Sequence, residues 1–578
     1  MRHDDVTRKT FPYNEGMDFE AILPYERSRA IVGYKMLDEP EEKSGNAVPM
    51  NFDLLVTDGE GKLVAEKHFL MDPADESSSR WRDFDLDLTG EKGSSLRFRL
   101  KIRPALFQIK SGYLLEFLFR NPLDFQYFEN QTIPSLILSE PVIIPREKTR
   151  PNIILISLDT LRADYLGCYG YERNVSPTID AFARENIMYE NAFCQSTWTL
   201  PSHLSMLTSR FPNELDTTHF SMYHKTPERE LKQLKDVALA EILREKGYYC
   251  AAFTDGVFLS SYYGFYKGFH VYDENYGSRG NSFALAEDWI AEHKDKDFFL
   301  FVHTYLIHDY SNNDGLFGEA NIGDDFGELL ESVRVLFPEI ENPKSFFSSG
   351  RTYGGRSSYA IRVKLVDFYI QDFFSFLEKE NLYDDAMILI TSDHGHSFGE
   401  RHNNDETIAV FHGRTPPYDP EIHVPLILKL PARMSQGPLV VKDDVRLLDV
   451  APTILAALGH DTVSQFRGRP ILPGFEPKEE DAYPFVYATW AKPGGSIREN
   501  GKKYIDVEGG GEEFYDLTND PGETRNLAPL QLEEMLELKM KYSEFISETG
   551  AGSVALEDAV GDAPPELREQ LRALGYIE

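Results

Sequence analysis

Alternating apolar and polar positions dominate the first quarter of the chain. Between residues 17 and 147, short runs with period two, such as 81–88 and 95–102, are separated by turn residues. Period-two alternation is typical of strands with one buried face, and frequent turns favour antiparallel pairing. We therefore predict an antiparallel β-sandwich accessory domain at 17–147, preceded by a tail at 1–16.

From residue 148 the pattern changes to continuous apolar runs of strand length. The runs at 152–158, 298–302 and 387–390 contain no charged residue, which fits strands buried on both faces of a parallel sheet. Amphipathic segments around them predict helices at 177–186, 237–246, 359–377 and 449–458. This βαβ order predicts an α/β fold, with a mostly parallel sheet flanked by helices, as a catalytic domain over 148–480.

The end of the chain, 481–578, has the pattern of a small subdomain. Segments 502–505 and 513–522 predict a small terminal sheet, and 564–575 predicts a short helix with three leucines on one face. We interpret this terminal helix as a packing element.

Composition excludes some classes of partner. The formal net charge of −35 argues against binding to nucleic acid or to anionic membranes, which requires a surplus of Lys and Arg. Three cysteines are too few for a disulfide framework. No run reaches the roughly 18 apolar residues of a spanning helix. The first residues lack an apolar signal-peptide core, so we expect a cytoplasmic protein. These patterns do not define its oligomeric state.

Metal-binding side chains follow three of the buried runs. Asp159 follows the first run, His303 and His308 follow the second, and Asp393 with His394 follows the third. In parallel sheets, ligands bind outside the carboxyl ends of the strands. Each residue alone also suits an ordinary strand end, but together they predict a metal site at one edge of the sheet.

A candidate nucleophile lies between the first two of these strand ends. In the segment STWTLPSHLSMLT at 196–208, Pro201 suits the first turn of a helix that continues to Thr208. Thr199 would then lie just before a helix N-terminus, which favours anions. A hydroxyl beside a metal can ionise and attack a sulfur or phosphorus centre. A simple helix cap is the alternative interpretation of Thr199.

Several segments, taken in order, carry a family resemblance. They read RPNIILISLDTLRADYLGCYG at 150–170, TSDHG at 391–395, LDVAPT at 448–453, FYDLTNDPGETRNL at 514–527 and LRALGY at 571–576. As a set they resemble the sulfatase family of the alkaline-phosphatase superfamily, over residues 148–578. The resemblance implies a divalent metal bound by Asp159, Asp393 and His394, with Thr199 at the nucleophile position.

The resemblance also implies residues that contact the substrate. His308 is at the position of a substrate-binding histidine, and His412 is where many members have a cation near the ester oxygens. Both would polarise or protonate the ester. His203 occupies the position where sulfatases have an arginine, so we predict that it binds substrate. Arg162 and Asp164 are interpreted as holding the first loop in place.

The chain departs from typical sulfatases at three positions. It has TLPSH at 199–203 in place of Cys-x-Pro-x-Arg, and threonine cannot be converted to formylglycine by the usual route. Thr160 replaces a second aspartate, and His394 replaces the usual asparagine. Because imidazole suits Mn²⁺ or Zn²⁺, we expect one of these ions ahead of Ca²⁺ or Mg²⁺, and no formylglycine. The departures resemble the threonine-nucleophile members, among them phosphodiesterases and transferases of phosphorylated head groups.

The leading interpretation is a metal-dependent hydrolase that cleaves phosphate or sulfate esters of a small molecule or glycan through Thr199. Phosphate is favoured, because the formylglycine route of sulfate release is missing. Two alternatives stay open: a soluble transferase that passes a phosphorylated head group or sulfate to a glycan, and a non-catalytic glycan-binding protein. A two-zinc site that adds His308 and His412 as ligands is less favoured than one metal.

Overall fold

The fold is described from a computed structural model of the chain. The described residues are 8–10, 17–22, 27–36, 50–58, 60–71, 82–89, 95–104, 136–139, 142–145, 148–215, 236–275, 282–308, 326–340, 355–400, 415–474, 483–490, 494–507, 511–550 and 568. They form two compact units. The first comprises the described residues up to Thr149, with Lys246–Tyr249 and Asp295–Asp297, and the second comprises the remainder.

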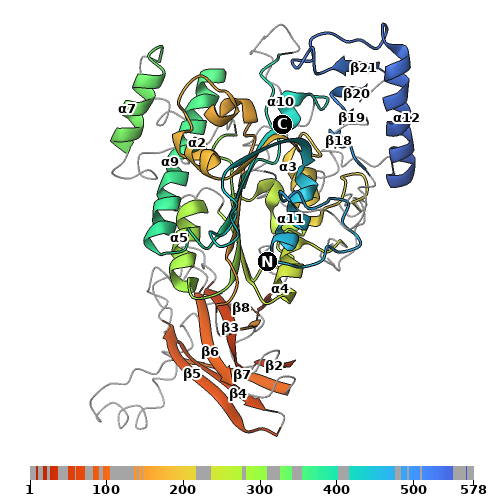
Figure 1. The fold of residues 1–578 in the computed structure, drawn as a ribbon. Coiled ribbons are helices and arrows are strands. Elements are labelled where there is room, and N and C mark those ends of the chain that lie inside the picture. The colour runs from red at the N-terminus through yellow and green to blue at the C-terminus, as the bar shows by residue number, and fades with distance from the viewer. Residues whose placement is uncertain are drawn as a thin grey trace, which may run out of the picture. The chain divides into compact units, whose positions relative to one another are not determined.

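The N-terminal unit consists of two antiparallel sheets (Figure 1). One has the order β1-β8-β3-β6, with β9 also paired to β3, and the other has the order β2-β7-β4-β5. The strands are β1 (Arg8–Thr10), β2 (Met17–Ile22), β3 (Arg27–Met36), β4 (Met50–Asp58), β5 (Leu63–Met71), β6 (Arg82–Thr89), β7 (Ser95–Pro104), β8 (Leu136–Ser139) and β9 (Val142–Pro145). The predicted antiparallel architecture is confirmed. The range predicted to be a tail, however, contains strand β1. This strand forms because its residues pair with the distant β8.

An eight-stranded mixed sheet forms the centre of the second unit, in the order β13-β12-β14-β10-β15-β16-β11-β17. The strands are β10 (Ile153–Leu158), β11 (Ile187–Phe193), β12 (Tyr249–Thr254), β13 (Val271–Glu274), β14 (Phe298–Thr304), β15 (Met387–Thr391), β16 (His423–Lys429) and β17 (Leu439–Arg446). The three runs predicted as buried strands are β10, β14 and β15. They are adjacent and parallel, and every residue in them is buried.

The other half of this sheet is less regular than the sequence predicts. Strand β16 is antiparallel to both β15 and β11, with Ile388 opposite Lys429 and Thr391 opposite Leu426. It therefore starts at the sheet edge where β15 ends and runs back across the sheet. The predicted α/β class is confirmed, with the parallel pairing strongest around β10.

Helices cover both faces of the central sheet. Figure 1 shows α2, α5 and α9 on one side and α3, α4 and α11 on the other. Their bounds are α2 (Pro177–Glu185), α3 (Thr199–Thr208), α4 (Leu239–Glu245), α5 (Ser282–His293), α9 (Arg356–Lys379) and α11 (Val450–Ala457), with α7 (Phe326–Leu336) packed beside α9 and the short α10 (Asp419–Ile422) before β16. Between these layers Ile153–Ile156 are fully buried, and burial of each such side chain contributes about 1.5–3 kcal/mol.

The C-terminal part of the same unit forms a four-stranded antiparallel sheet, in the order β18-β19-β20-β21. The strands are β18 (Val486–Thr489), β19 (Gly495–Glu499), β20 (Lys502–Val507) and β21 (Gly511–Asp516), followed by α12 (Leu532–Thr549). Helix α12 buries Met535, Leu538, Tyr542 and Phe545 in a cluster with residues of the sheet. The predicted small terminal sheet is therefore present. The predicted helix at 564–575 lies outside the described residues, apart from Arg568.

Candidate active site

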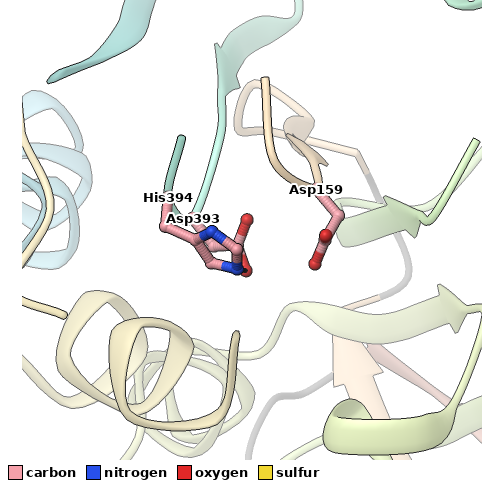
Figure 2. Close-up of side chains that lie close together, drawn as sticks. All are labelled: Asp159, Asp393 and His394. Atoms are coloured by element: carbon pink, nitrogen blue, oxygen red, sulfur yellow. Dashed lines mark ion pairs between the residues drawn. The ribbon is translucent and has the colours of Figure 1, made fainter. Parts of the chain in front are cut away.

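Strands β10 and β15 bring three side chains together at one edge of the central sheet. Asp159 directly follows β10, and Asp393 and His394 follow β15 after a single residue. One ligand atom from each of the three lies within 4.8 Å of the others, and all three residues are fully buried. Figure 2 shows Asp159 facing Asp393 and His394 across a short gap. Parallel neighbouring strands with matched ends produce this convergence.

Thr199 joins this group from helix α3. Its hydroxyl donates a hydrogen bond to Asp159 Oδ2 at 3.1 Å and lies 3.4 Å from His394 Nε2. His394 Nε2 in turn lies 3.5 Å from Asp393 Oδ2. Donor atoms that surround one metal ion at about 2.1 Å are roughly 3.4 Å apart in a tetrahedral arrangement. The observed spacings therefore fit one ion.

Hydrogen bonds outside this group orient the donors. His394 Nδ1 donates to the carbonyl of Gly395 at 2.8 Å, so Nε2 presents its lone pair to the group. Asp393 Oδ1 accepts from the backbone N–H of Thr160 at 3.3 Å. Among the described residues, Asp159 Oδ1 and Asp393 Oδ2 are buried without a hydrogen-bond partner. Buried carboxylate oxygens without a donor fit metal coordination, with the remaining atoms held by the protein.

The pKa shifts of the two aspartates also fit a bound metal ion. Burial raises the pKa of Asp159 well above its ordinary value, and the neighbouring Asp393 raises it further. Burial also raises the pKa of Asp393, but the imidazoles of His394, His203 and His303 outweigh it, so that pKa is lowered. No Lys or Arg of the described chain forms an ion pair with either carboxylate. A divalent cation would let both ionise, and two carboxylates with an imidazole suit Mn²⁺ or Zn²⁺.

Helix α3 presents its N-terminus at this group. The sequence predicts Thr199 just before the helix, whereas the structure has it as the first helical residue, with Trp198 as N-cap. The N–H groups of a first helical turn have no acceptor within the helix, and the helix dipole favours an anion there. The hydroxyl of Thr199 and an anion-binding helix end are therefore adjacent.

His203 is fully buried one turn into the same helix. Its Nδ1 lies 2.9 Å from the carbonyl oxygen of Thr199 and 3.5 Å from Asp393 Oδ2, and its Nε2 lies 2.9 Å from Ser157 Oγ. Burial lowers its pKa, although the neighbouring Asp393 raises it. Both ring nitrogens contact protein groups, and the substrate-binding role of His203 stays a prediction.

Two further histidines follow β14. His303 Nε2 lies 3.5 Å from Asp159 Oδ2, a contact for which the sequence pattern assigned no individual role. In the sequence, His303 is marked only by its position at the end of a buried run. The register of β14 with β10 brings it to Asp159. His308, predicted to bind substrate, is 2% exposed, and burial and the nearby His394 lower its pKa. His412 lies outside the described residues.

A buried arginine connects the loops that carry the aspartates. Arg162 donates two hydrogen bonds to Asp164, one to Glu400 at 2.6 Å and one to the carbonyl of His396 at 2.8 Å. It therefore ties the loop after β10 to the loop after β15, which agrees with the holding role predicted for Arg162 and Asp164.

The backbone between Asp159 and Arg162 is strained. Thr160 has φ of 61°, an outlier for a β-branched residue, which costs on the order of 1–3 kcal/mol. The Tyr359 hydroxyl donates to the Thr160 carbonyl at 2.6 Å and accepts from Arg162 N–H at 2.8 Å. This conformation directs the N–H of Thr160 to Asp393.

Comparison with known sequences identifies related proteins. The sulfatase family model matches residues 151–460, more than half of the chain. The chain is 22% identical over 442 residues to the Delta 4,5-hexuronate-2-O-sulfatase of Bacteroides thetaiotaomicron, covering 69% of this chain and 87% of that protein. It is 23% identical over 446 residues to an ulvan-active sulfatase of Formosa agariphila, covering 70% and 82%.

Solved structures share the fold. Ps i-CgsB, solved in complex with k-i-k-neocarrahexaose, gives a TM-score of 0.52 at 17% identity and covers 74% of this chain and 98% of its own. The phosphonate monoester hydrolase of Agrobacterium radiobacter gives a TM-score of 0.50 at 19% identity and covers 69% and 95%. Within the described part of this chain, no helix is long and apolar enough to cross a membrane.

Proposed function

Because this chain belongs to the sulfatase family, we propose that it is a metal-dependent hydrolase of sulfate or phosphate esters with Thr199 as the nucleophile. One observation carries the proposal. The Thr199 hydroxyl lies at a helix N-terminus, 3.1 Å from Asp159 Oδ2 and 3.4 Å from His394 Nε2. A nucleophile, a proton acceptor and an anion-binding helix end therefore meet in one buried site.

Asp159, Asp393 and His394 are the residues that would hold the metal. A divalent ion bound there lowers the pKa of an adjacent hydroxyl and offsets the charge of the ester oxygens. The first turn of α3 would bind the remaining oxyanion through its N–H groups. The proposed ion is Mn²⁺ or Zn²⁺, because an imidazole takes part in the donor set.

In the first step, Thr199 Oγ attacks the sulfur or phosphorus atom and gives its proton to Asp159 Oδ2, the acceptor it already contacts. The bond from that atom to the alcohol oxygen breaks, and the departing oxygen takes a proton from solvent water, to which Asp159 returns the proton that it accepted. His308, neutral and buried at the same edge, is proposed to polarise the leaving oxygen. His412 keeps the same assignment from the family resemblance alone.

In the second step, water attacks the ester formed on Thr199. The bond between Thr199 Oγ and sulfur or phosphorus breaks, one proton of the attacking water passes by way of Asp159 to Thr199 Oγ, and sulfate or phosphate leaves. We propose phosphate ahead of sulfate, because a threonine lacks the formylglycine route for releasing a sulfate. The names of two relatives refer to a hexuronate and to ulvan, so we propose an ester of a sugar hydroxyl as the substrate.

The test is a panel of four nitrophenyl esters: phosphate monoester, phosphodiester, phosphonate and sulfate. The full chain, loaded with Mn²⁺ or Zn²⁺, should turn over at least one of them, and intact mass after rapid quench should show the ester on Thr199. Thr199→Ala should remove both signals.

A matched variant keeps this test specific. Thr199→Ser retains a hydroxyl at the same position and should retain measurable turnover, whereas Thr199→Val retains the shape without the oxygen. Turnover by the native protein no higher than that of Thr199→Ala on all four esters would contradict the proposed function.

A further inference from the structure

Two fully buried residues connect the nucleophile to the central sheet. Ser157 lies on β10, two residues before Asp159, and His203 lies on α3, four residues after Thr199. The Ser157 hydroxyl, the His203 ring and the Thr199 carbonyl form a continuous chain with two contacts of 2.9 Å. Ser157 and His203 are both fully buried.

The hydrogen-bond partners define the tautomer of His203. A carbonyl oxygen only accepts, so Nδ1 carries the proton and donates it to Thr199. Nε2 then has the lone pair and accepts the Ser157 hydroxyl hydrogen. Every polar atom of the ring is therefore used within the protein.

A bond from histidine to the carbonyl four residues earlier is by itself an ordinary helix feature. His293 on α5 makes the same contact with Trp289, at 2.6 Å, away from the aspartates. The second nitrogen distinguishes His203, because it extends the contact to the strand that carries Asp159. His293 is thus a natural control.

The two hydrogen bonds of His203 hold the first turn of α3 in place. Thr197 is held on the other side of Thr199, where its N–H donates to the Thr489 carbonyl at 3.1 Å. With the backbone held before and after it, Thr199 has a defined Cα–Cβ direction, and a β-branched residue in a helix has few side-chain rotamers. The 3.1 Å contact from its hydroxyl to Asp159 depends on that direction.

We propose that Ser157 and His203 are positioning residues that hold the Thr199 hydroxyl in line with Asp159 for attack. The proposal rests on the proposed function of Thr199. It replaces the substrate contact predicted for His203 with a role through Thr199. A displacement of about 1 Å in a reacting group can reduce a rate by roughly 100-fold, so a weakened anchor should reduce kcat.

The experiment removes the hydrogen bond between Ser157 and His203 by changing each partner in turn. Ser157→Ala removes the hydroxyl, and His203→Asn keeps a donor for the Thr199 carbonyl while losing the reach to Ser157. Each variant should reduce kcat by about 10-fold to 100-fold with little change in KM, and the double variant should show no further loss. Isothermal titration should give Ser157→Ala a metal Kd within about 3-fold of native, because no donor is altered.

Matched controls separate positioning from packing. Ser205→Ala removes another fully buried hydroxyl from α3, and His293→Asn alters the same local contact elsewhere. Both controls should leave kcat unchanged, whatever their effect on Tm. Equal kcat losses in the controls, or additive losses in the double variant, would overturn the proposal.

Crystal structures give a readout that needs no turnover. In Ser157→Ala the Thr199 hydroxyl should move out of hydrogen-bond range of Asp159 or occupy two rotamers, and in Ser205→Ala it should remain in place. An unmoved hydroxyl in Ser157→Ala would overturn the positioning role. Failure of the native protein on every ester would instead overturn the proposed function, and the structures would still decide the positioning role.

Discussion

Two buried acidic clusters in the second compact unit are neutralised in different ways. In the C-terminal part, Lys503 is fully buried and contacts Asp419 at 2.8 Å and Glu523 at 2.7 Å, and Arg498 contacts Asp419 at 2.7 Å. At the sheet edge, the only ion-pair partners of Asp159 and Asp393 among the described residues are imidazoles.

The difference separates a structural cluster from a reactive one. Burial raises the pKa of Asp419, but Lys503 and Arg498 outweigh it and hold that pKa below its ordinary value. The chain thus supplies the counter-charge of the C-terminal cluster itself. Asp159 has no such partner, and its pKa is raised. Burying a pair of acids without a cation from the chain costs folding free energy. The presence of such a pair at this edge therefore favours a bound metal ion and a catalytic role.

Asp393→Asn should have the largest effect. Loss of this carboxylate removes a charged donor, so metal binding should weaken by at least about 100-fold and kcat should fall by about 1,000-fold or more. Isothermal titration and ester turnover measure the two effects. Asp367→Asn is the control, since Asp367 is a buried acid that accepts N–H bonds from Thr178 and Ile179. It should lower Tm without weakening metal binding.

Lys503→Met should give the converse result in the other cluster. Removal of the buried ammonium leaves Glu523 without its cation, which should destabilise the fold by about 3–5 kcal/mol. Urea denaturation measures the loss, and the metal Kd of the folded protein should not change. Lys502→Met, which removes a partly exposed ion pair with Asp516, should cost less than about 1 kcal/mol. Similar losses for the two variants would contradict the assignment of a buried structural cluster.

Glu421 tests whether an uncompensated buried acid makes stability depend on pH. Burial raises its pKa from 4.5 to about 8, although a hydrogen bond from Thr415 lowers it. A raised folded-state pKa means that its contribution is fully present below about pH 4.5 and is lost as the pH rises through about 8. The native protein should lose on the order of 1 kcal/mol per pH unit across this window.

Glu421→Gln removes this titration and should flatten the curve. Urea denaturation of the metal-free protein at several pH values measures both chains. The variant should be less stable than native, or equal to it, at the acid end and more stable at the alkaline end. Parallel curves for the two proteins would show that Glu421 does not titrate in this range.

Thr160→Asp should have the smallest effect and sharpen the description of the metal site. Aspartate tolerates the positive φ of this position better than threonine does, and it adds a carboxylate beside Asp393. Because Ca²⁺ affinity rises with the number of charged oxygen ligands, the Kd of Thr160→Asp for Ca²⁺ should be about 10-fold lower than that of the native protein. Titration with Ca²⁺ measures the change, and Thr160→Asn should show none of it. An equal gain in both variants would assign the effect to the backbone.

The sequence predicts the regular parts of the fold because their signals are local. Continuous apolar runs mark β10, β14 and β15, since a strand buried on both faces cannot carry charge. The antiparallel course of β16 was not predicted, because the composition of a buried strand is the same for either direction. Strand β1 was missed for a related reason, since only its partner β8 holds it in a sheet.

The sequence by itself determined which donors are available: two carboxylates, an imidazole and a hydroxyl, at strand ends and at a helix start. The ability of each side chain to bind a metal or to act as a nucleophile follows from its residue type alone. Only the tertiary structure decided how the other groups are used. It turns His203 toward Ser157, brings His303 to Asp159 and directs the Thr160 N–H to Asp393. These contacts join residues that are 46, 144 and 233 positions apart, so their geometry depends on packing across the whole unit.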